Sequence, residues 1–172
     1  GQVDPSFSAR FSAYTRRYRY IMLDTPTPPA LLRDRVSWTH TPLDGAAMDA
    51  AATQLLGEQD FSAFRAAGCQ ANSPWRCIES ISVEREGAFL VLDITANAFL
   101  HHMVRNIAGT LMAVGHGERR PEWVAEVLAT RDRRKAGITA PPQGLYLVDI
   151  RYPPESGIPR PEPGPWWLSP RA

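Results

Sequence analysis

The chain has 172 residues, a formal net charge of +1 at pH 7, and apolar and charged fractions of 44% and 22%. This length and composition are those of a globular protein with one domain and a sizeable core, and they exclude a disordered chain. The near-zero charge gives no ground for inferring a nucleic-acid partner from composition, so that inference has to rest on clustered residues.

Neither a membrane span nor a signal peptide is visible, because no apolar run is long enough and Gly1 to Phe11 contains no apolar core. We therefore expect a cytoplasmic protein without a membrane partner. Cys69 and Cys77 lack the C-x-x-C spacing of a structural zinc site, so we expect reduced thiols and no metal.

The first predicted element is a strand from Tyr14 to Leu23, rich in aromatic and branched residues and followed by a proline-rich turn. Its period of two separates the side chains into one face with Tyr14, Arg16, Tyr18, Tyr20 and Met22 and another with Arg17, Arg19, Ile21 and Leu23. Interleaved arginine and tyrosine can bind single-stranded nucleic acid by stacking and phosphate contact. Arginine stems that lie over tyrosine rings at a sheet edge give the same pattern, and the residue types alone favour this second interpretation.

The next segments predict a helix and a hairpin. Asp44 to Leu56 has an apolar face and an aspartate suited to cap its start. Asp60 to Arg65 predicts a short turn of helix that buries two phenylalanines. Ile78 to Arg85 and Ala88 to Ala96 are rich in branched residues and flank a glycine, which predicts an antiparallel hairpin with the second strand more central.

Asn97 to Gly115 predicts an amphipathic helix, with Asn97 as its N-cap and Gly115 as its C-terminal stop. The apolar stripe recurs at steps of three and four and consists of Phe99, Met103, Ile107, Leu111 and Val114. Arg105 lies about 200 degrees around the helix from this stripe, since each residue advances the helix by roughly 100 degrees. It is either a solvated arginine on an outer face or a functional group, and Gly109, one turn along, leaves room for a close approach.

The neighbouring His101 and His102 diverge by about 100 degrees on a helix, so they cannot bind one ion together as an i, i+4 pair can. No further ligands accompany them. We therefore expect a structural or RNA-facing role for one of them rather than a metal site.

Arg120 to Thr130 predicts another helix, with Pro121 at its first position, and a basic cluster from Arg131 to Lys135 follows. Such a cluster is usually a solvated loop. Arg133 becomes a phosphate contact only if the cluster flanks the same groove as the arginine and tyrosine side chains described above.

Leu145 to Tyr152 predicts the last strand, and proline and glycine dominate the residues that follow. We therefore divide the chain into a domain, residues 1–152, and a proline-rich tail, residues 153–172. The tail either wraps across the domain with its tryptophans buried or reaches a neighbouring subunit. The order of the elements predicts an α+β fold, with a mainly antiparallel sheet and helices packed on one face.

Five motifs in chain order resemble the tRNA pseudouridine synthase I family, the TruA type, and the similarity runs from about Phe7 to Tyr152. The motifs are Phe7-x-Ala9-Arg10-Phe11-Ser12-Ala13, Arg17-Tyr18-Arg19-Tyr20, Leu56-Gly57-x-x-Asp60-Phe61-x-x-Phe64-Arg65, Phe99-x-His101-His102-Met103-Val104-Arg105-Asn106-Ile107 and Gly144-Leu145-Tyr146-Leu147. The resemblance implies the C-terminal domain of a homodimeric enzyme that converts uridine to pseudouridine in the anticodon stem-loop of tRNA without a cofactor.

The resemblance implies that Tyr18 stacks on the target base and that Arg105 pairs with a catalytic aspartate. Candidate substrate-binding residues are Arg16, Arg17, His101, Arg133 and Leu145. The chemistry suits the first pair, because an aromatic ring recovers part of the free energy spent in flipping a base out of its stack. A guanidinium keeps an enclosed carboxylate ionised and can hold it with two hydrogen bonds.

The chain also departs from the family. The nucleophilic aspartate of the family stands in a Gly-Arg-Thr-Asp-x-Gly segment of an N-terminal domain, and that segment does not occur in this sequence. Ser8 stands where many members have histidine, which puts a role for that side chain in doubt. We therefore expect the C-terminal part of a longer enzyme that is inactive by itself.

Two alternatives follow from the same residues. The missing aspartate motivates a non-catalytic RNA-binding or dimerisation module. The adjacent histidines motivate an unrelated α+β hydrolase, which requires them to lie in a cleft.

Overall fold

The computed structural model describes residues 7–160, 164, 165, 167 and 168. In these residues six strands form one sheet: β1 (Thr15–Asp24), β2 (Ser37–Thr39), β3 (Gly57–Asp60), β4 (Trp75–Glu86), β5 (Phe89–Ala96) and β6 (Leu145–Arg151). The helices are α1 (Gly45–Ala52), α2 (Met103–Gly115) and α3 (Trp123–Thr130), with short 3-10 turns η1 (Thr53–Leu55), η2 (Ser62–Phe64), η3 (Arg133–Lys135) and η4 (Pro154–Ser156).

The strand β1 organises the sheet because it pairs with three others. One side of β1 is antiparallel to β5, and β4 and β3 continue the sheet from there. On its other side, the first half of β1 is antiparallel to β6 and the last three residues are parallel to β2. The sheet is therefore mixed and mainly antiparallel, which confirms the predicted α+β class.

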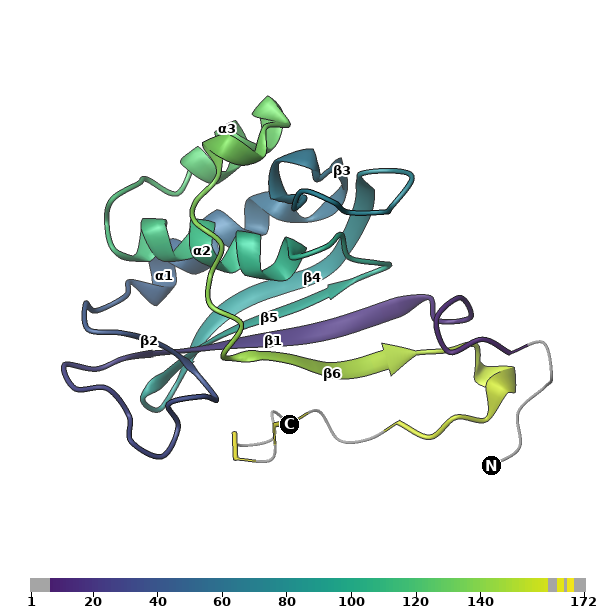
Figure 1. Cartoon of the computed structure of the whole chain (residues 1–172), viewed down its shortest axis with the longest axis horizontal. Helices are drawn as coiled ribbons and strands as arrows, with labels where there is room; N and C mark the ends of the chain where they lie inside the picture. The colour runs from purple at the N-terminus through teal and green to yellow at the C-terminus, as the bar shows by residue number, and fades with distance from the viewer. Residues whose placement is uncertain (1–6, 161–163, 166, 169–172) are drawn as a thin grey trace.

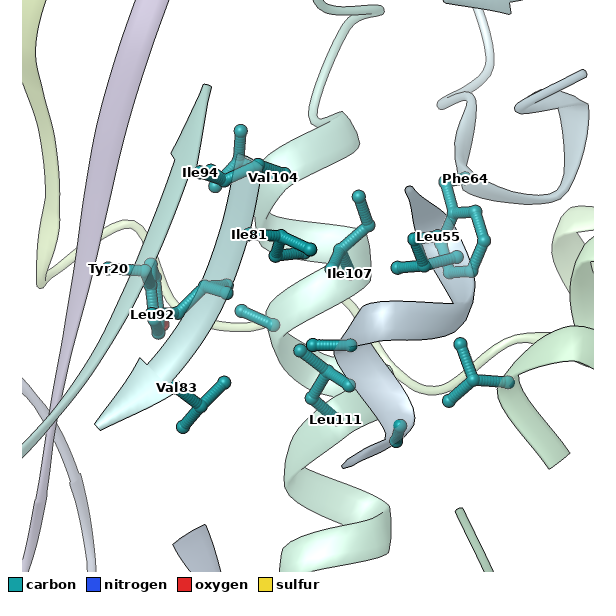
Figure 2. Close-up of a cluster of buried hydrophobic side chains, with 14 of the residues drawn as sticks. Tyr20, Leu55, Phe64, Ile81, Val83, Leu92, Ile94, Val104, Ile107 and Leu111 are labelled. Atoms are coloured by element: carbon teal, nitrogen blue, oxygen red, sulfur yellow. The ribbon is translucent and has the colours of Figure 1, made fainter. Parts of the chain in front are cut away.

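The three helices cover one face of this sheet, as predicted (Figure 1). Alternation along the strands places one set of apolar side chains against them, and Figure 2 shows how the two layers interlock. The sheet contributes Tyr20, Ile81, Val83, Leu92 and Ile94, and the helical layer contributes Leu55, Phe64, Val104, Ile107 and Leu111. The predicted apolar stripe of the 97–115 helix thus faces the core.

The other face of the sheet carries a smaller apolar cluster of Ile21, Leu23, Val36, Val91 and Leu168. The Trp167 ring packs on the Phe89 ring at a centroid distance of 5.4 Å. The described part of the tail therefore packs across the domain, in agreement with one of the two predicted arrangements, whereas Trp166 lies outside the described residues.

The helix containing Arg105 starts later than predicted, at Met103 instead of just after Asn97. The Asn97 side chain accepts hydrogen bonds from the backbone N–H groups of Cys77 and Ala98, so it joins the ends of β4 and β5 and caps no helix. His102 precedes α2 with a left-handed backbone, φ 58°. Pro121 likewise lies before α3, which begins at Trp123, whereas Asp44 caps α1 through a hydrogen bond from Ala47 N, as predicted. The strands β2 and β3 are too short to give a pattern and were not predicted.

Candidate active site

The outward side of α2 is covered by the chain itself, where the segment 137–140 crosses the helix. A Cβ atom on Gly109 would lie 1.8 Å from the carbonyl oxygen of Ile138, and one on Gly137 would lie 2.7 Å from Thr110 Cα. Only glycine permits backbones to approach so closely. The room predicted beside Gly109 is therefore confirmed, and the crossing segment occupies it.

Arg105 is half-buried at this crossing and is held by a reciprocal pair of hydrogen bonds. Its Nε donates to the carbonyl oxygen of Ala140 at 2.8 Å, and Ala140 N donates to the carbonyl oxygen of Arg105 at 3.1 Å. No hydrogen bond or ion pair joins its Nη1 or Nη2 to any side chain in the part of the chain that is described. Two terminal nitrogens of a fixed guanidinium thus remain able to hold a carboxylate.

Two tyrosines, Tyr18 and Tyr20, lie on the helix-covered face of β1, and Tyr20 is the one near this arginine. The buried Tyr20 donates its hydroxyl to the carbonyl oxygen of Pro141 at 2.8 Å, adjacent to the carbonyl that Arg105 holds. Burial raises the pKa of Tyr20 to about 12, although Ser37 and the nearby charge of Arg105 oppose the rise. Arg105 therefore lies close enough to the Tyr20 phenol to act on it electrostatically.

Tyr18 lies two positions before Tyr20 on the same face of β1, roughly 7 Å from it along the strand. Its half-buried ring meets Phe99 edge to face at a centroid distance of 5.1 Å. Burial raises the pKa of the Tyr18 hydroxyl, and the charge of Arg16 partly offsets this. The ring is therefore partly enclosed, and its hydroxyl stays protonated at neutral pH.

Leu145 completes this side of the sheet, because it opens β6 directly opposite Tyr20. The preceding Gly144 has φ +95°, and a Cβ there would lie 2.4 Å from the carbonyl oxygen of Ile21. The glycine thus lets β6 begin tightly against β1. Leu145 is in this way placed opposite Tyr20, and Tyr20 is the residue of this face that lies near Arg105.

Two other predicted substrate contacts, Arg16 and Arg17, do not offer a free guanidinium group to a substrate. Arg17 points to the opposite face of the sheet, where its Nη2 lies 2.7 Å from Asp93 Oδ2. Arg16 donates to the carbonyl oxygens of Arg10, Ala13 and Asn97. Both arginines bind the chain itself, so they are not free for RNA on a continuous face of the strand. The alternative of a sheet edge is wrong, because β1 is paired with other strands on both sides.

His101 and Arg133 also have structural neighbours. The His101 side chain is exposed, and its backbone N donates to Cys69 Sγ at 3.3 Å. Arg133 turns inward and donates to Gly137, Asn106 and Thr139. The sequence indicated Asn106 as a polar group near the site without a role, whereas it gave no indication of Thr139 or Ala140. Gly109 and Gly137 were a signal that two backbones meet there.

Carboxylates near the described arginines are engaged elsewhere. Asp24 pairs with Arg85 at 2.8 Å, Asp60 with Arg131 at 3.2 Å, and Asp93 with both arginines on the far face of β1. Asp4 lies outside the described residues. Within the described ranges, Arg105 therefore has no carboxylate partner.

In the described residues, no three His, Cys, Asp or Glu side chains gather as a metal site would require. No described helix has the length and apolar character needed to cross a membrane. The rings of His101 and His102 lie against each other at a centroid distance of 3.9 Å, and both side chains are exposed, so the hydrolase alternative finds no enclosed pair of histidines.

Fold and site together define an α+β protein whose sheet carries Tyr18 and Tyr20 on the helix-covered face and whose helix α2 carries Arg105 near the Tyr20 phenol. The family described as tRNA pseudouridine synthase matches residues 51–153. The chain belongs to this family, as its motifs indicated.

Similar proteins carry the name tRNA pseudouridine synthase A. The protein of Aeromonas hydrophila is 55% identical over 167 residues, which is 97% of this chain and 62% of that protein. The proteins of Tolumonas auensis and Alcanivorax borkumensis are 53% and 52% identical over 97% and 98% of this chain. The chain spans 62% to 64% of the length of these relatives.

Proposed function

We propose that this chain is the C-terminal part, with residues 1–152 as its domain and 153–172 as its tail, of an enzyme that isomerises uridine to pseudouridine in the anticodon stem-loop of tRNA. The carrying observation is the state of Arg105. Its Nε is fixed by the Ala140 carbonyl oxygen, while its terminal nitrogens bind no carboxylate of the described residues. The names of the relatives support tRNA as the substrate.

In this proposal Arg105 holds the nucleophilic carboxylate, which a part of the enzyme outside the described residues contributes. An enclosed carboxylate would otherwise take up a proton and lose its nucleophilicity, and a guanidinium prevents this because it remains charged. Tyr18 supplies the stacking surface for the flipped uracil, and Leu145 supports the pocket beside it. In the same proposal the Tyr18 hydroxyl takes part in proton transfer when the new C–C bond loses its hydrogen.

The experiment is the release of tritium from tRNA labelled at C5 of uridine, measured with the complete protein and with this chain alone. We expect release from the complete protein and none from the chain alone. Arg105→Lys keeps the charge but loses the planar fork, so the rate should fall at least about a hundredfold. Near-normal release by this variant would show that the role of Arg105 is wrong.

A second pair of variants separates the two roles of Tyr18. Tyr18→Phe keeps the ring and loses the hydroxyl, so we expect tRNA binding to persist while the rate falls. Tyr18→Leu loses the ring and should impair both capture of the base and the rate, because stacking on an aromatic ring contributes roughly 1–3 kcal/mol per base. Equal, full activity of both variants would contradict the assignment.

The complete enzyme is further proposed to act as a homodimer, in the cytoplasm and without cofactor or metal. Activity that survives exhaustive dialysis against a chelator would support the last point. A size measurement of the complete protein in solution tests the dimer.

A further inference from the structure

Asn106, the residue after Arg105, is fully buried and forms hydrogen bonds in three directions. Its Nδ2 donates to the carbonyl oxygen of Phe64 at 2.7 Å. Its Oδ1 accepts from Arg133 Nη2 at 3.0 Å and from Thr139 Oγ1 at 2.7 Å. A buried amide with satisfied donor and acceptor fixes the elements that it joins, here α2, η2 and the segment 133–139.

Arg133 is the other centre of this network. Its Nη2 uses both hydrogens, on Asn106 Oδ1 and on Thr139 Oγ1, the second at 2.8 Å. Its Nη1 donates to the carbonyl oxygen of Gly137 at 2.8 Å. Three of five guanidinium donors are therefore spent inside the protein, which leaves one Nη1 hydrogen and the Nε hydrogen for any outside group.

The network leads directly to Arg105. It fixes residues 137–139 on α2, and the next residue, Ala140, forms the reciprocal pair with Arg105. Gly137 N also donates to Thr110 Oγ1 at 3.0 Å. The segment 137–140 packs directly on the backbone of α2 at Gly109, so it cannot move closer to the helix. The position of the Ala140 carbonyl, and with it the direction of the guanidinium, thus depends on the residues that clamp the segment.

We propose that Arg133, Asn106 and Thr139 are positioning residues that aim the Arg105 guanidinium, and that Arg133 is not primarily a phosphate contact. The proposal rests on the role of Arg105 in the proposed function. It predicts a loss in the rate of the chemical step with little change in tRNA affinity. A phosphate contact would instead weaken binding and reduce its dependence on salt.

The first test uses Arg133→Gln in the complete protein, with Arg134→Gln as the matched control. Arg134 lies in the same short turn and its side chain pairs with Asp132, so the control removes the same charge and leaves the network intact. We expect kcat for tritium release to fall roughly ten- to hundredfold in Arg133→Gln, because small misplacement of a catalytic group has effects of that order. KM and the salt dependence of tRNA binding should match those of the control, whose kcat should be unchanged.

The second test guards against loss of the fold and uses Thr139. Thr139→Val keeps the shape but removes the hydroxyl that links Arg133 to Asn106, whereas Thr139→Ser keeps it. We expect a lower kcat in the valine variant and near-normal kcat in the serine variant, with thermal unfolding measured for both. Rescue by serine distinguishes positioning from a general loss of packing.

Two outcomes overturn the inference. One is a raised KM and a reduced salt dependence in Arg133→Gln with kcat unchanged, which would make Arg133 a phosphate contact. The other is full kcat in both Arg133→Gln and Thr139→Val while Arg105→Lys is inactive, which would leave the proposed function standing and remove the positioning role. Full activity of Arg105→Lys would overturn the proposed function itself.

Discussion

On the face of β1 turned away from the helices, Arg17 and Arg19 both hold the carboxylate of Asp93, at 2.7 and 2.9 Å. On the helix-covered side, Arg105 is held through Nε by a backbone carbonyl and has no carboxylate partner in the described residues. In the first arrangement the carboxylate and the guanidinium groups neutralise each other. It also connects β1 and β5 to the tail, since Arg19 Nη1 donates to the carbonyl oxygen of Gly164 at 3.1 Å. The second is fixed but incomplete.

The contrast shows what separates a structural arginine from a catalytic candidate in this protein. Burial by itself would raise the pKa of the Asp93 carboxyl, but hydrogen bonds from Arg17 and Arg19 outweigh it and hold the pKa below its usual range. That carboxylate and its arginines satisfy each other. At Arg105 the protein supplies orientation without neutralisation, which is the arrangement that an incoming carboxylate needs.

The largest effect should come from replacing the two kinds of arginine in parallel. In the complete protein, Arg105→Ala should lower the rate of tritium release about a thousandfold, as expected for removal of a group that stabilises charge in an enclosed site. Arg17→Ala should leave the rate within a few fold, since Asp93 keeps Arg19. Single-turnover rates would measure both variants. Comparable losses of rate in the two variants would show that Arg105 is no more important for the reaction than Arg17.

The next effect is on stability and belongs to the far face. Asp93→Ala leaves the buried Arg19 without its carboxylate, so the free energy of unfolding should fall by about 3 kcal/mol. Urea denaturation would measure it, with the exposed Asp34→Ala as a control that should change stability by no more than about 0.5 kcal/mol. If Asp93→Ala lowered the free energy of unfolding no more than the control, the ion pairs of Asp93 with Arg17 and Arg19 would not stabilise the fold.

A smaller effect is expected at the crossing of α2. Gly109→Ala places a Cβ against the Ile138 carbonyl oxygen, and because both groups belong to backbone, the segment has to shift. We expect a loss of about 2 kcal/mol in stability, measured by urea denaturation, together with a reduced rate, because Ala140 moves with the segment. A fully active Gly109→Ala variant would show that the orientation of Arg105 does not depend on the close approach of the segment to Gly109.

The smallest effect concerns Tyr20, which supports the same crossing. Tyr20→Phe leaves the Pro141 carbonyl oxygen without its donor and should cost about 1 kcal/mol at neutral pH. Because the folded pKa of about 12 lies above the unfolded value near 10, the stability contributed by the protonated phenol is fully present below about pH 10 and is lost as the pH rises towards 12. Unfolding measured from pH 8 to 12 should therefore decline less steeply in Tyr20→Phe, and parallel declines would contradict this.

Much of the architecture was predictable because it is encoded locally. The period of two in β1, the apolar stripe of α2 and the glycine between β4 and β5 each involve residues a few positions apart, and all three elements were confirmed. The start of α2 was predicted wrongly because Asn97 is a good N-cap by residue type. Its side chain bonds to Cys77, twenty positions earlier, which no local pattern reveals.

The sequence by itself determined the α+β class, the outward position of Arg105 and, through five ordered motifs, the family. Tertiary structure alone decided which group each arginine binds. Arg17 meets the Asp93 carboxylate across 76 positions, Arg133 the Asn106 amide across 27, and Arg105 the Ala140 carbonyl across 35. These contacts depend on sheet register and on the path of one segment over α2. Side-chain type and periodicity cannot specify such pairings, because they describe neighbours along one element and not the elements that packing brings together.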